Sequence, residues 1–442
     1  MCAAMADSTR ELVFEMLTAG DDGRVCRDIP EASCNEEARN FTTHVMALST
    51  SKIADGLVDP KLVLSWLLAT LGAPTLLIGL LVPVREAGSL LPQLFTAGAL
   101  RRLAQRKWAW AAGSMVQGLS ALAIAMAALT LEGARAGMAI IAALGVLAVA
   151  RSVCSVTYKD VLGKTVSKSR RGSATGAATT VGAAAVLLFG ALLASGLGAR
   201  MDLVSAGLIG AGVFWIAGAA IFMQLKEAPG ATEGGANPFR AAMDNLGLLG
   251  EDAQLRRFIA VRALLISTAL APPFMVALAA RSSGSDGAGG FGGLGLLIIA
   301  SAGAGLLSSY VWGRLADKSS RKVLILTSGA ATLALCAALG LNAAGLLGAV
   351  WALPLVLFAL MIAYQGVRLG RSTHLVDMAT QDTRAAYTAL SNTIIGSLLL
   401  LGGVFSLVAE YAGEATVLGL LAIMSGLALP VALGLREVQP QE

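Results

Sequence analysis

The sequence is poor in charged, aromatic and histidine residues. Of its 442 residues, 14% are charged, 5% are aromatic and two are histidine. So little polar surface cannot cover a water-soluble fold of this length. The two histidines and the five cysteines match no zinc-binding spacing, so no metal site and no cofactor are expected, and no disulfide is expected either.

Other missing features exclude whole classes of protein. The apolar runs do not alternate with polar residues, which excludes a membrane β-barrel. No G-x-x-x-x-G-K-S/T loop is present, which argues against ATP-driven pumping. The apolar runs also lack clustered nucleophiles, metal ligands or acids, so no catalytic residues are expected and an enzyme is disfavoured. Residues 1–50 contain no apolar core and therefore no cleavable signal peptide.

Apolar residues dominate instead, at 56% of the chain, and the mean hydropathy is +0.72. A membrane-spanning helix needs about 20 mostly apolar residues. Runs of this kind predict an all-α membrane protein with twelve transmembrane helices, over residues 60–82, 86–103, 108–130, 136–157, 172–196, 201–223, 258–280, 291–312, 323–341, 345–367, 387–409 and 415–435.

Basic residues are distributed unevenly between these runs. Most of the 33 Lys and Arg lie in the two ends of the chain and in every second loop. Positively charged flanks stay in the cytoplasm, so both termini and these loops are predicted to be cytoplasmic. The basic residues are dispersed over several segments, so they do not indicate binding to nucleic acid.

The composition also predicts the division of the chain. Residues 1–50 are expected to form a cytoplasmic extension with two short helices, the second beginning at Ser33, which either packs beneath the first helices or docks a regulator. Ile53, Leu57 and Val58 continue the helical pattern of the first span, so a start before Pro60 is the alternative. Residues 224–257, rich in glycine and proline, read as a cytoplasmic linker. The linker separates two halves, 51–223 and 258–435, and residues 436–442 form a cytoplasmic tail.

Two patterns recur in both halves. The charged segment Gly313 to Lys322 has a degraded copy at Gly98 to Lys107, 215 positions earlier (98 to 313). Arg151 and Asp160 are nine positions apart, as are Arg368 and Asp377, 217 positions later (151 to 368). Such repeats are typical of transporters built from two related helix bundles, so we expect six helices in each half.

The residues of the second-half segment match a known loop pattern. The pattern G-x-L-A-D-R/K-x-G-R-R/K is matched at Gly313, Leu315, Ala316, Asp317, Lys318, Arg321 and Lys322, with Ser320 in place of glycine. In the first half Gly98, Leu100, Arg106 and Lys107 match, while Arg102 replaces the aspartate and Gln105 the glycine.

Over residues 55–435 the chain therefore resembles the major facilitator superfamily. The resemblance implies two pseudo-symmetric six-helix bundles that carry a small molecule across the lipid bilayer by alternating access. The run Pro83 to Gln93 is similar to segments of bacterial transporters, which implies a bacterial inner membrane. A monomer is expected.

By resemblance, the two repeated segments act as a cytoplasmic latch between the bundles. The alternative is that their basic residues only obey the positive-inside rule. Because Arg102 replaces the acid, it is expected to contact Asp160 or a lipid phosphate. The latch candidates are Gly313, Arg314, Asp317, Lys318, Arg321, Lys322, Gly98, Arg102, Arg106 and Lys107.

Charged residues inside apolar runs are candidates for coupling. Arg85 and Glu86 are expected near the outer end of the second span, where Glu86 is the best candidate for a proton carrier. Arg151 lies deep in the fourth span and resembles the family's fourth-helix arginine, although it could also snorkel. Arg262 is expected to snorkel. Further candidates, each of which could instead bridge helices, are Gln93, Tyr364, Gln365, Arg368 and Asn392.

These observations predict a secondary active transporter for a small organic solute, with proton coupling as a hypothesis. The scarcity of buried acids favours an anionic or amphiphilic solute slightly over efflux of drug-like compounds. A non-transporting membrane sensor or scaffold on the same fold is the alternative. The sequence specifies neither the substrate nor the direction of transport.

Overall fold

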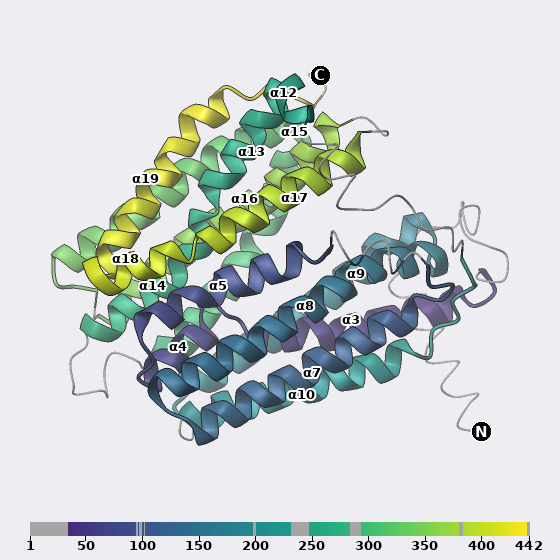
Figure 1. Ribbon diagram of the computed structural model, residues 1–442, viewed down its shortest axis with the longest axis horizontal. Helices are drawn as coiled ribbons and strands as arrows, with labels where there is room; N and C mark the ends of the chain where they lie inside the picture. Colours follow the sequence, from purple (N-terminus) through teal and green to yellow (C-terminus); the bar gives the residue numbers. More distant parts are fainter. Residues whose placement is uncertain are drawn as a thin grey trace.

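The computed structural model describes residues 34–93, 96, 100, 102–197, 200–230, 247–282, 293–347, 349–379 and 383–439. Within these residues the regular structure is helical throughout, and no strand occurs in them. Figure 1 shows the helices running roughly parallel or antiparallel to one another. The prediction of an all-α protein is confirmed for this part of the chain.

Short turns separate the helices of the first part of the chain. Gly72 and Gly133 adopt positive φ angles of 72° and 58° at two of these turns, a conformation that glycine tolerates best. The helices are α3 (Glu37–Leu57), α4 (Val63–Thr70), α5 (Thr75–Leu90), α7 (Lys107–Thr130), α8 (Gly133–Thr165), α9 (Lys168–Ala194) and α10 (Arg200–Phe222).

In the second part, Asp252 caps a helix by accepting hydrogen bonds from the backbone N–H groups of Gln254 and Leu255. The longest helix has 50 residues and is interrupted at Ser319, whose backbone is extended (φ −164°, ψ 96°). The helices are α12 (Gly247–Glu251), α13 (Ala253–Leu265), α14 (Ser267–Ser282), α15 (Leu294–Ala343), α16 (Ala352–Met378), α17 (Arg384–Leu401), α18 (Val404–Ala412) and α19 (Glu414–Leu433).

Helices of each part pack mainly on helices of the same part. In the first part, α3 packs on α9 and α10, and α7 packs on α8 and α10. In the second part, α15 packs on α16 and α19, and α13 and α14 also pack on α19. Contacts between the two parts run through α5 with α14, α17 and α18, through α4 with α14, and through α9 with α15. A site shared by both parts is therefore expected beside α4, α5 or α9.

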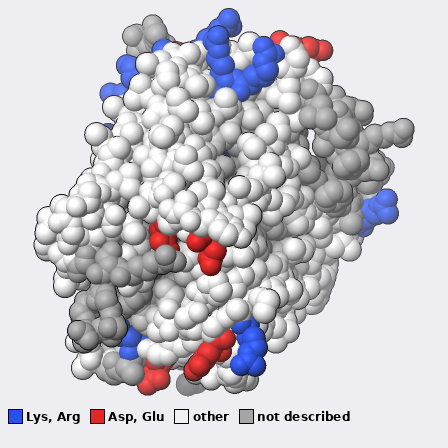
Figure 2. Space-filling view, turned by 60° about the vertical axis from the view of Figure 1, so that its left-hand side comes forward, with Lys and Arg blue, Asp and Glu red and all other residues white. Residues whose placement is uncertain are grey.

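The surface is that of a membrane protein. Nine helices in the described ranges are long and apolar enough to cross a bilayer. Figure 2 shows a face that is mostly neither acidic nor basic, with Lys and Arg near its upper, lower and right-hand edges, and acidic residues near the top, the bottom and the middle. A surface with few charged side chains suits lipid, because charged side chains are costly in hydrocarbon.

The predicted limits of the first two spans, 60–82 and 86–103, are wrong. A turn at residues 71–74 lies inside the predicted first span, and α5 begins at Thr75. The preceding helix, α3, crosses the predicted boundary at residue 50 and buries polar side chains such as Asn40 and His44 against other helices. A count of apolar residues misses a helix whose polar face is covered by protein.

One contact occurs in both parts. The Asn40 side chain, on α3, exchanges hydrogen bonds with the backbone of Lys226, at 3.2 and 2.9 Å. The Gln254 side chain, on α13, accepts one from the backbone N–H of Arg436, at 3.0 Å. In both cases the first turn of an early helix holds the segment that follows the last long helix of the same part. The repeat seen in the sequence therefore has a counterpart in three dimensions.

Cysteine chemistry differs from the expectation at one position. Cys34 is disulfide-bonded, whereas Cys154 and Cys336 are free thiols. The expectation of no disulfide is wrong, because spacing along the chain does not reveal which cysteines the fold brings together.

Candidate functional site

The helical path from α3 to α4 is interrupted around Pro60. Proline has no backbone N–H and cannot continue the hydrogen-bond ladder of α3. The Asp59 carboxylate instead accepts hydrogen bonds from the backbone N–H groups of Lys61 (2.8 Å) and Leu62 (3.0 Å). The interruption leaves Lys61 buried, at 8% exposure, between the two helical segments.

Asp55, near the end of α3, receives two arginine side chains. Its carboxylate oxygens lie 3.1 Å from Nη2 of Arg85 on α5 and 2.6 Å from Nη2 of Arg151 on α8. One carboxylate joins three helices in this way. Because it carries one negative charge against two positive ones, the cluster keeps a net positive charge.

Lys61 connects the two parts of the chain. Its Nζ donates a hydrogen bond to the hydroxyl of Tyr364 on α16 (2.9 Å) and lies 3.9 Å from the carboxylate of Glu86 on α5. The ammonium group also lies 4.3 Å from the centre of the Tyr364 ring, a cation–π geometry. A polar link between the first and second parts therefore passes through one buried cation.

A cavity of about 460 Å³ is lined by α5, α8, α13, α14, α16 and α17. This volume is typical of small-molecule sites, which span about 300–1,000 Å³. Its lining includes the predicted candidates Glu86, Gln93, Tyr364 and Asn392. Its cationic lining consists of Lys159, Arg262, Arg368 and Arg371.

A second cavity of about 430 Å³ lies between α3, α9, α15 and α16. Its polar lining includes Lys52, Asp59 and Gln365. Arg368 lines both cavities and therefore stands between them. Together the two cavities place charged groups from both parts of the chain around one central region.

Arg262 is held inside the protein. It is 7% exposed, and its guanidinium donates to the hydroxyl of Ser391 and, at 3.2 Å, to the amide oxygen of Asn392, both on α17. The prediction that Arg262 snorkels to the surface is wrong, because Ser391 and Asn392 on α17 accept its hydrogen bonds inside the protein.

Two hydrogen bonds connect the two parts of the chain at the end of the molecule where α5 begins. The hydroxyl of Thr75 donates to the carboxylate of Glu414 on α19 (3.2 Å), and the backbone N–H of Leu76 donates to Glu410 on α18 (3.2 Å). These bonds join the two parts of the chain at that end.

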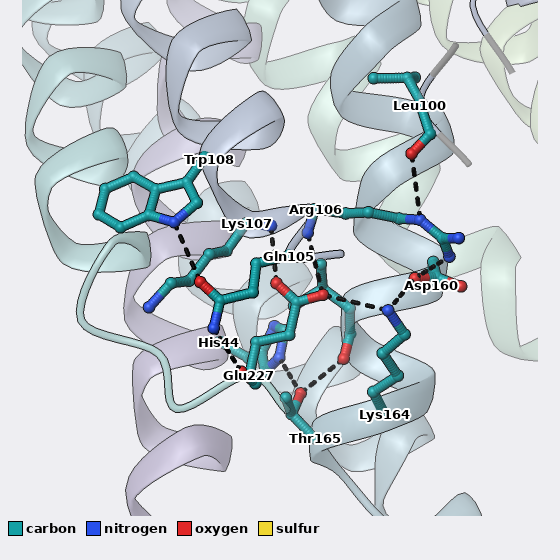
Figure 3. A network of polar contacts seen from close by, with 11 residues as sticks. His44, Leu100, Gln105, Arg106, Lys107, Trp108, Asp160, Lys164, Thr165 and Glu227 are labelled. Atoms are coloured by element: carbon teal, nitrogen blue, oxygen red, sulfur yellow. Dashed lines mark hydrogen bonds and ion pairs between the residues drawn. The ribbon is translucent and has the colours of Figure 1, made fainter. Parts of the chain in front are cut away.

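A buried carboxylate organises the repeated segment of the first part (Figure 3). The Glu227 side chain is 0% exposed and accepts hydrogen bonds from the backbone N–H groups of Arg106 (3.0 Å) and Lys107 (2.8 Å) at the start of α7. A negative charge at the N-terminus of a helix also interacts favourably with the helix dipole. Lys164 pairs with Glu227 at 3.3 Å and with Asp160 at 3.0 Å. The segment is thus fastened within its own part.

Of the two partners expected for Arg102, Asp160 is wrong, and a lipid phosphate stays a prediction. Arg106, and not Arg102, forms the ion pair with Asp160, and the Arg102 side chain is exposed. Arg106 is nearer because it also contacts the backbone of Leu100 and faces α8 from the start of α7. Gly98 lies outside the described residues.

The segment following α19 holds the second repeated segment. The Gln439 side chain accepts a hydrogen bond from the backbone N–H of Ser320 (3.0 Å) and donates one to Asp377 (2.8 Å). The Ser319 hydroxyl donates to Glu437. Asp317 is exposed and forms no ion pair within the part of the chain that the structure describes.

The basic residues of this second segment face outward for the most part. Arg314, Lys318 and Lys322 are exposed, next to Gly313. Arg321 donates to the backbone carbonyl of Leu433 (2.7 Å). The structure therefore brings Arg321 to the end of α19 and leaves the other three exposed, with Arg314 lying 5.2 Å from the centre of the Tyr310 ring.

The predicted location of Arg85 and Glu86 near an outer mouth is corrected. Both lie in the second half of α5, where Arg85 contacts Asp55 of α3 and Glu86 contacts Lys61 between α3 and α4. Their predicted location was wrong because the limits of the first predicted span, 60–82, were wrong. Lys61, Arg371 and Glu227 were not among the predicted site residues, although Lys61 contacts Glu86 and Tyr364, Arg371 lines the cavity and Glu227 pairs with Lys164.

No protein-family model matches the sequence, and no curated protein matches it. Solved structures do. The nucleoside transporter NupG matches with a TM-score of 0.65 and 12% identity over 90% of this chain and 98% of that one. A POT family transporter in complex with a thioalcohol-conjugated peptide gives 0.69 and 10% over 93% and 98%, and a D-xylose-proton symporter gives 0.66 and 11% over 90% and 98%.

At these identities the similarity concerns the fold. Nearly the full length of each transporter is covered, including both parts of this chain. The nine apolar helices agree with a location in a bilayer. The chain is an integral membrane protein with the fold of the major facilitator superfamily transporters.

Proposed function

We propose that the protein is a secondary active transporter that moves a small organic solute across the membrane by alternating access. The observation that carries this proposal is the central region lined by charged side chains from both parts of the chain, with Lys61 linking α5 to α16. Transporters of this fold bind their solute near the membrane midplane, between two helix bundles.

The proposed architecture has twelve spans in two bundles of six. Nine helices qualify as spans by length and apolar content among the described residues. One of them, α15, has 50 residues and an interruption at Ser319, and at 1.5 Å per residue its length of about 75 Å suffices for two crossings. The path α3–α4 and the helix α5 supply the remaining two.

The proposed orientation places both termini and the two repeated segments in the cytoplasm of a bacterial cell, with the protein in the inner membrane as a monomer. The positive-inside rule supports this orientation. The bonds of Thr75 and Leu76 to Glu414 and Glu410 would then close the outer side. The structure would represent an inward-facing state, in which each repeated segment is fastened to its own part and the latch is released.

Proton coupling through Glu86 is part of the proposal. Glu86 lines the cavity and contacts Lys61, which also holds Tyr364 of the other part. Neutralising this carboxylate would release Lys61 from one of its partners. Protonation would thereby alter the contact between the bundles.

The test uses purified protein in liposomes and a panel of a sugar, a nucleoside, a dipeptide and a dicarboxylate. We expect uptake of at least one solute to be driven by a pH gradient. Glu86→Gln should abolish gradient-driven uptake while retaining exchange of the same solute across the membrane. The exposed Glu132 provides the control, because Glu132→Gln removes an acid outside the cavity.

Two results would contradict these proposals. Gradient-driven uptake that survives Glu86→Gln would rule out this residue as the proton carrier. Binding of a solute without any flux would instead support a sensor or scaffold on the same fold.

A further inference from the structure

We infer that the cavity of about 460 Å³ binds a small organic anion with at least two negative charges, and that Arg262 is its anchoring residue. The inference rests on the proposed transport function, because the cavity is the solute site of that proposal. It adds the chemical class of the solute and the side chains that recognise it.

The charge of the lining is the first argument. Four cations, Lys159, Arg262, Arg368 and Arg371, face one carboxylate, Glu86, which gives a net charge of +3. None of the four cations forms an ion pair with a carboxylate of the described ranges, whereas Glu86 already lies beside Lys61. A solute with two or more negative charges would balance this lining, and a cationic solute would be repelled.

The surroundings of Arg262 are the second argument. Its two described hydrogen-bond partners, Ser391 and Asn392, are neutral. Its Nε is buried and has no hydrogen-bond partner among the described residues. A buried guanidinium without a counter-ion is costly, and a carboxylate or phosphate oxygen would satisfy both its charge and its free donor.

The rest of the lining favours an organic solute over an inorganic ion. Aliphatic side chains from α13, α14, α16 and α17 form the wall beside the cations and would contact a carbon skeleton. They include Leu265, Ile266, Val367, Leu375, Ile395 and Leu399.

The experiment measures thermal stability of the full-length protein, purified in detergent. The probes are succinate and glycerol 3-phosphate, their uncharged counterparts succinamide and glycerol, and the dication putrescine. We expect at least one dianion to raise the Tm in a saturable way, and neither the neutral compounds nor putrescine to do so. Arg262→Gln should weaken dianion binding about tenfold or more, as expected for hydrogen bonds to a charged group.

Arg135→Gln is the matched control, because Arg135 is exposed and lies outside the cavity. It should leave dianion binding unchanged. If Arg262→Gln fails to fold, Arg371→Gln on α16 provides the second test, since Arg371 is half-buried and lines the same cavity. Equal weakening by the Arg135 control would overturn the assignment.

Stabilisation by the neutral compounds or putrescine alone, or by none of the probes, would also overturn the anion site. Flux measured in liposomes separates this failure from that of the proposed function. Transport of a neutral or cationic solute would contradict the anion site and leave the transporter proposal intact. Dianion binding without flux would do the reverse.

Discussion

Two residues of the interrupted path from α3 to α4, Asp55 and Lys61, form ion pairs with charged side chains of α5 and α8. Asp55 receives Arg85 and Arg151, and Lys61 contacts Glu86. Each of the two therefore stabilises partners from other helices. Replacing a shared residue should lower the free energy of unfolding more than replacing one of its partners, because the charged groups left behind have no other ion-pair partner among the residues that the structure describes.

Asp55→Asn tests this expectation. It should destabilise the folded protein by about 3 kcal/mol, the scale for breaking a buried ion pair, because it leaves two guanidinium groups without their carboxylate. Arg151→Gln should lower the Tm less, and combining the two changes should cost less than their sum. The Tm of purified protein measures this. Asp202→Asn, at an exposed residue of α10, is the control, and additive effects would contradict a shared cluster.

At the scale of elements, the contact between α9 and α15 depends on the absence of side chains. A Cβ atom added to Gly295 would lie 2.4 Å from the backbone nitrogen of Ala194 and 2.5 Å from the carbonyl oxygen of Gly190. These are backbone atoms of a long helix and cannot rotate away. The two helices come from different parts of the chain, so this crossing sets how closely the parts approach.

Gly295→Ala should therefore separate α9 from α15 and lower the Tm, despite the better helix propensity of alanine. It should also reduce the rate of solute flux. Gly340→Ala is the matched control on the same helix, because no atom lies within 4 Å of the added Cβ there. If both variants behave alike in the Tm and flux assays, close approach at this crossing is not required.

The helices differ in how closely the sequence predicted their limits. Runs such as Lys107–Thr130 and Glu414–Leu433 were predicted nearly to their ends because they are apolar all round. α3 was predicted only in part, as a short helix from Ser33 and an earlier start of the first span, because it buries polar side chains against α9 and α10 and has no continuous apolar run. The candidate site could not be predicted in full without α3, because Asp55 lies on it. Asp59 and Lys61 lie inside the protein only if residues 37–70 form one interrupted helical path. The residues around Glu227 in the sequence do not indicate that it pairs with a distant lysine.

At the scale of the whole molecule, the two parts meet firmly at the end where α5 starts. Thr75 and Glu414 are hydrogen-bonded there across the two parts. If the cavity alternates between two sides, this end must open once in every cycle. A solute cannot leave through it while the contact persists.

Oxidative cross-linking tests the requirement. Thr75→Cys combined with Glu414→Cys, in a background without the native cysteines, should stop solute flux on oxidation and recover it on reduction. Each single variant should respond to neither treatment. Undiminished flux through fully cross-linked protein would show that this end stays closed throughout transport.

The interruption around Pro60 has a mechanical consequence. Between α3 and α4 the chain lacks a continuous helical ladder, and the Asp59 carboxylate bonds to the backbone at the start of α4 instead. A break in the helical ladder is a place where the angle between α3 and α4 can change at little cost. If transport requires α3 to move relative to α4, we expect the change in angle to occur here and Lys61, beside the break, to move least.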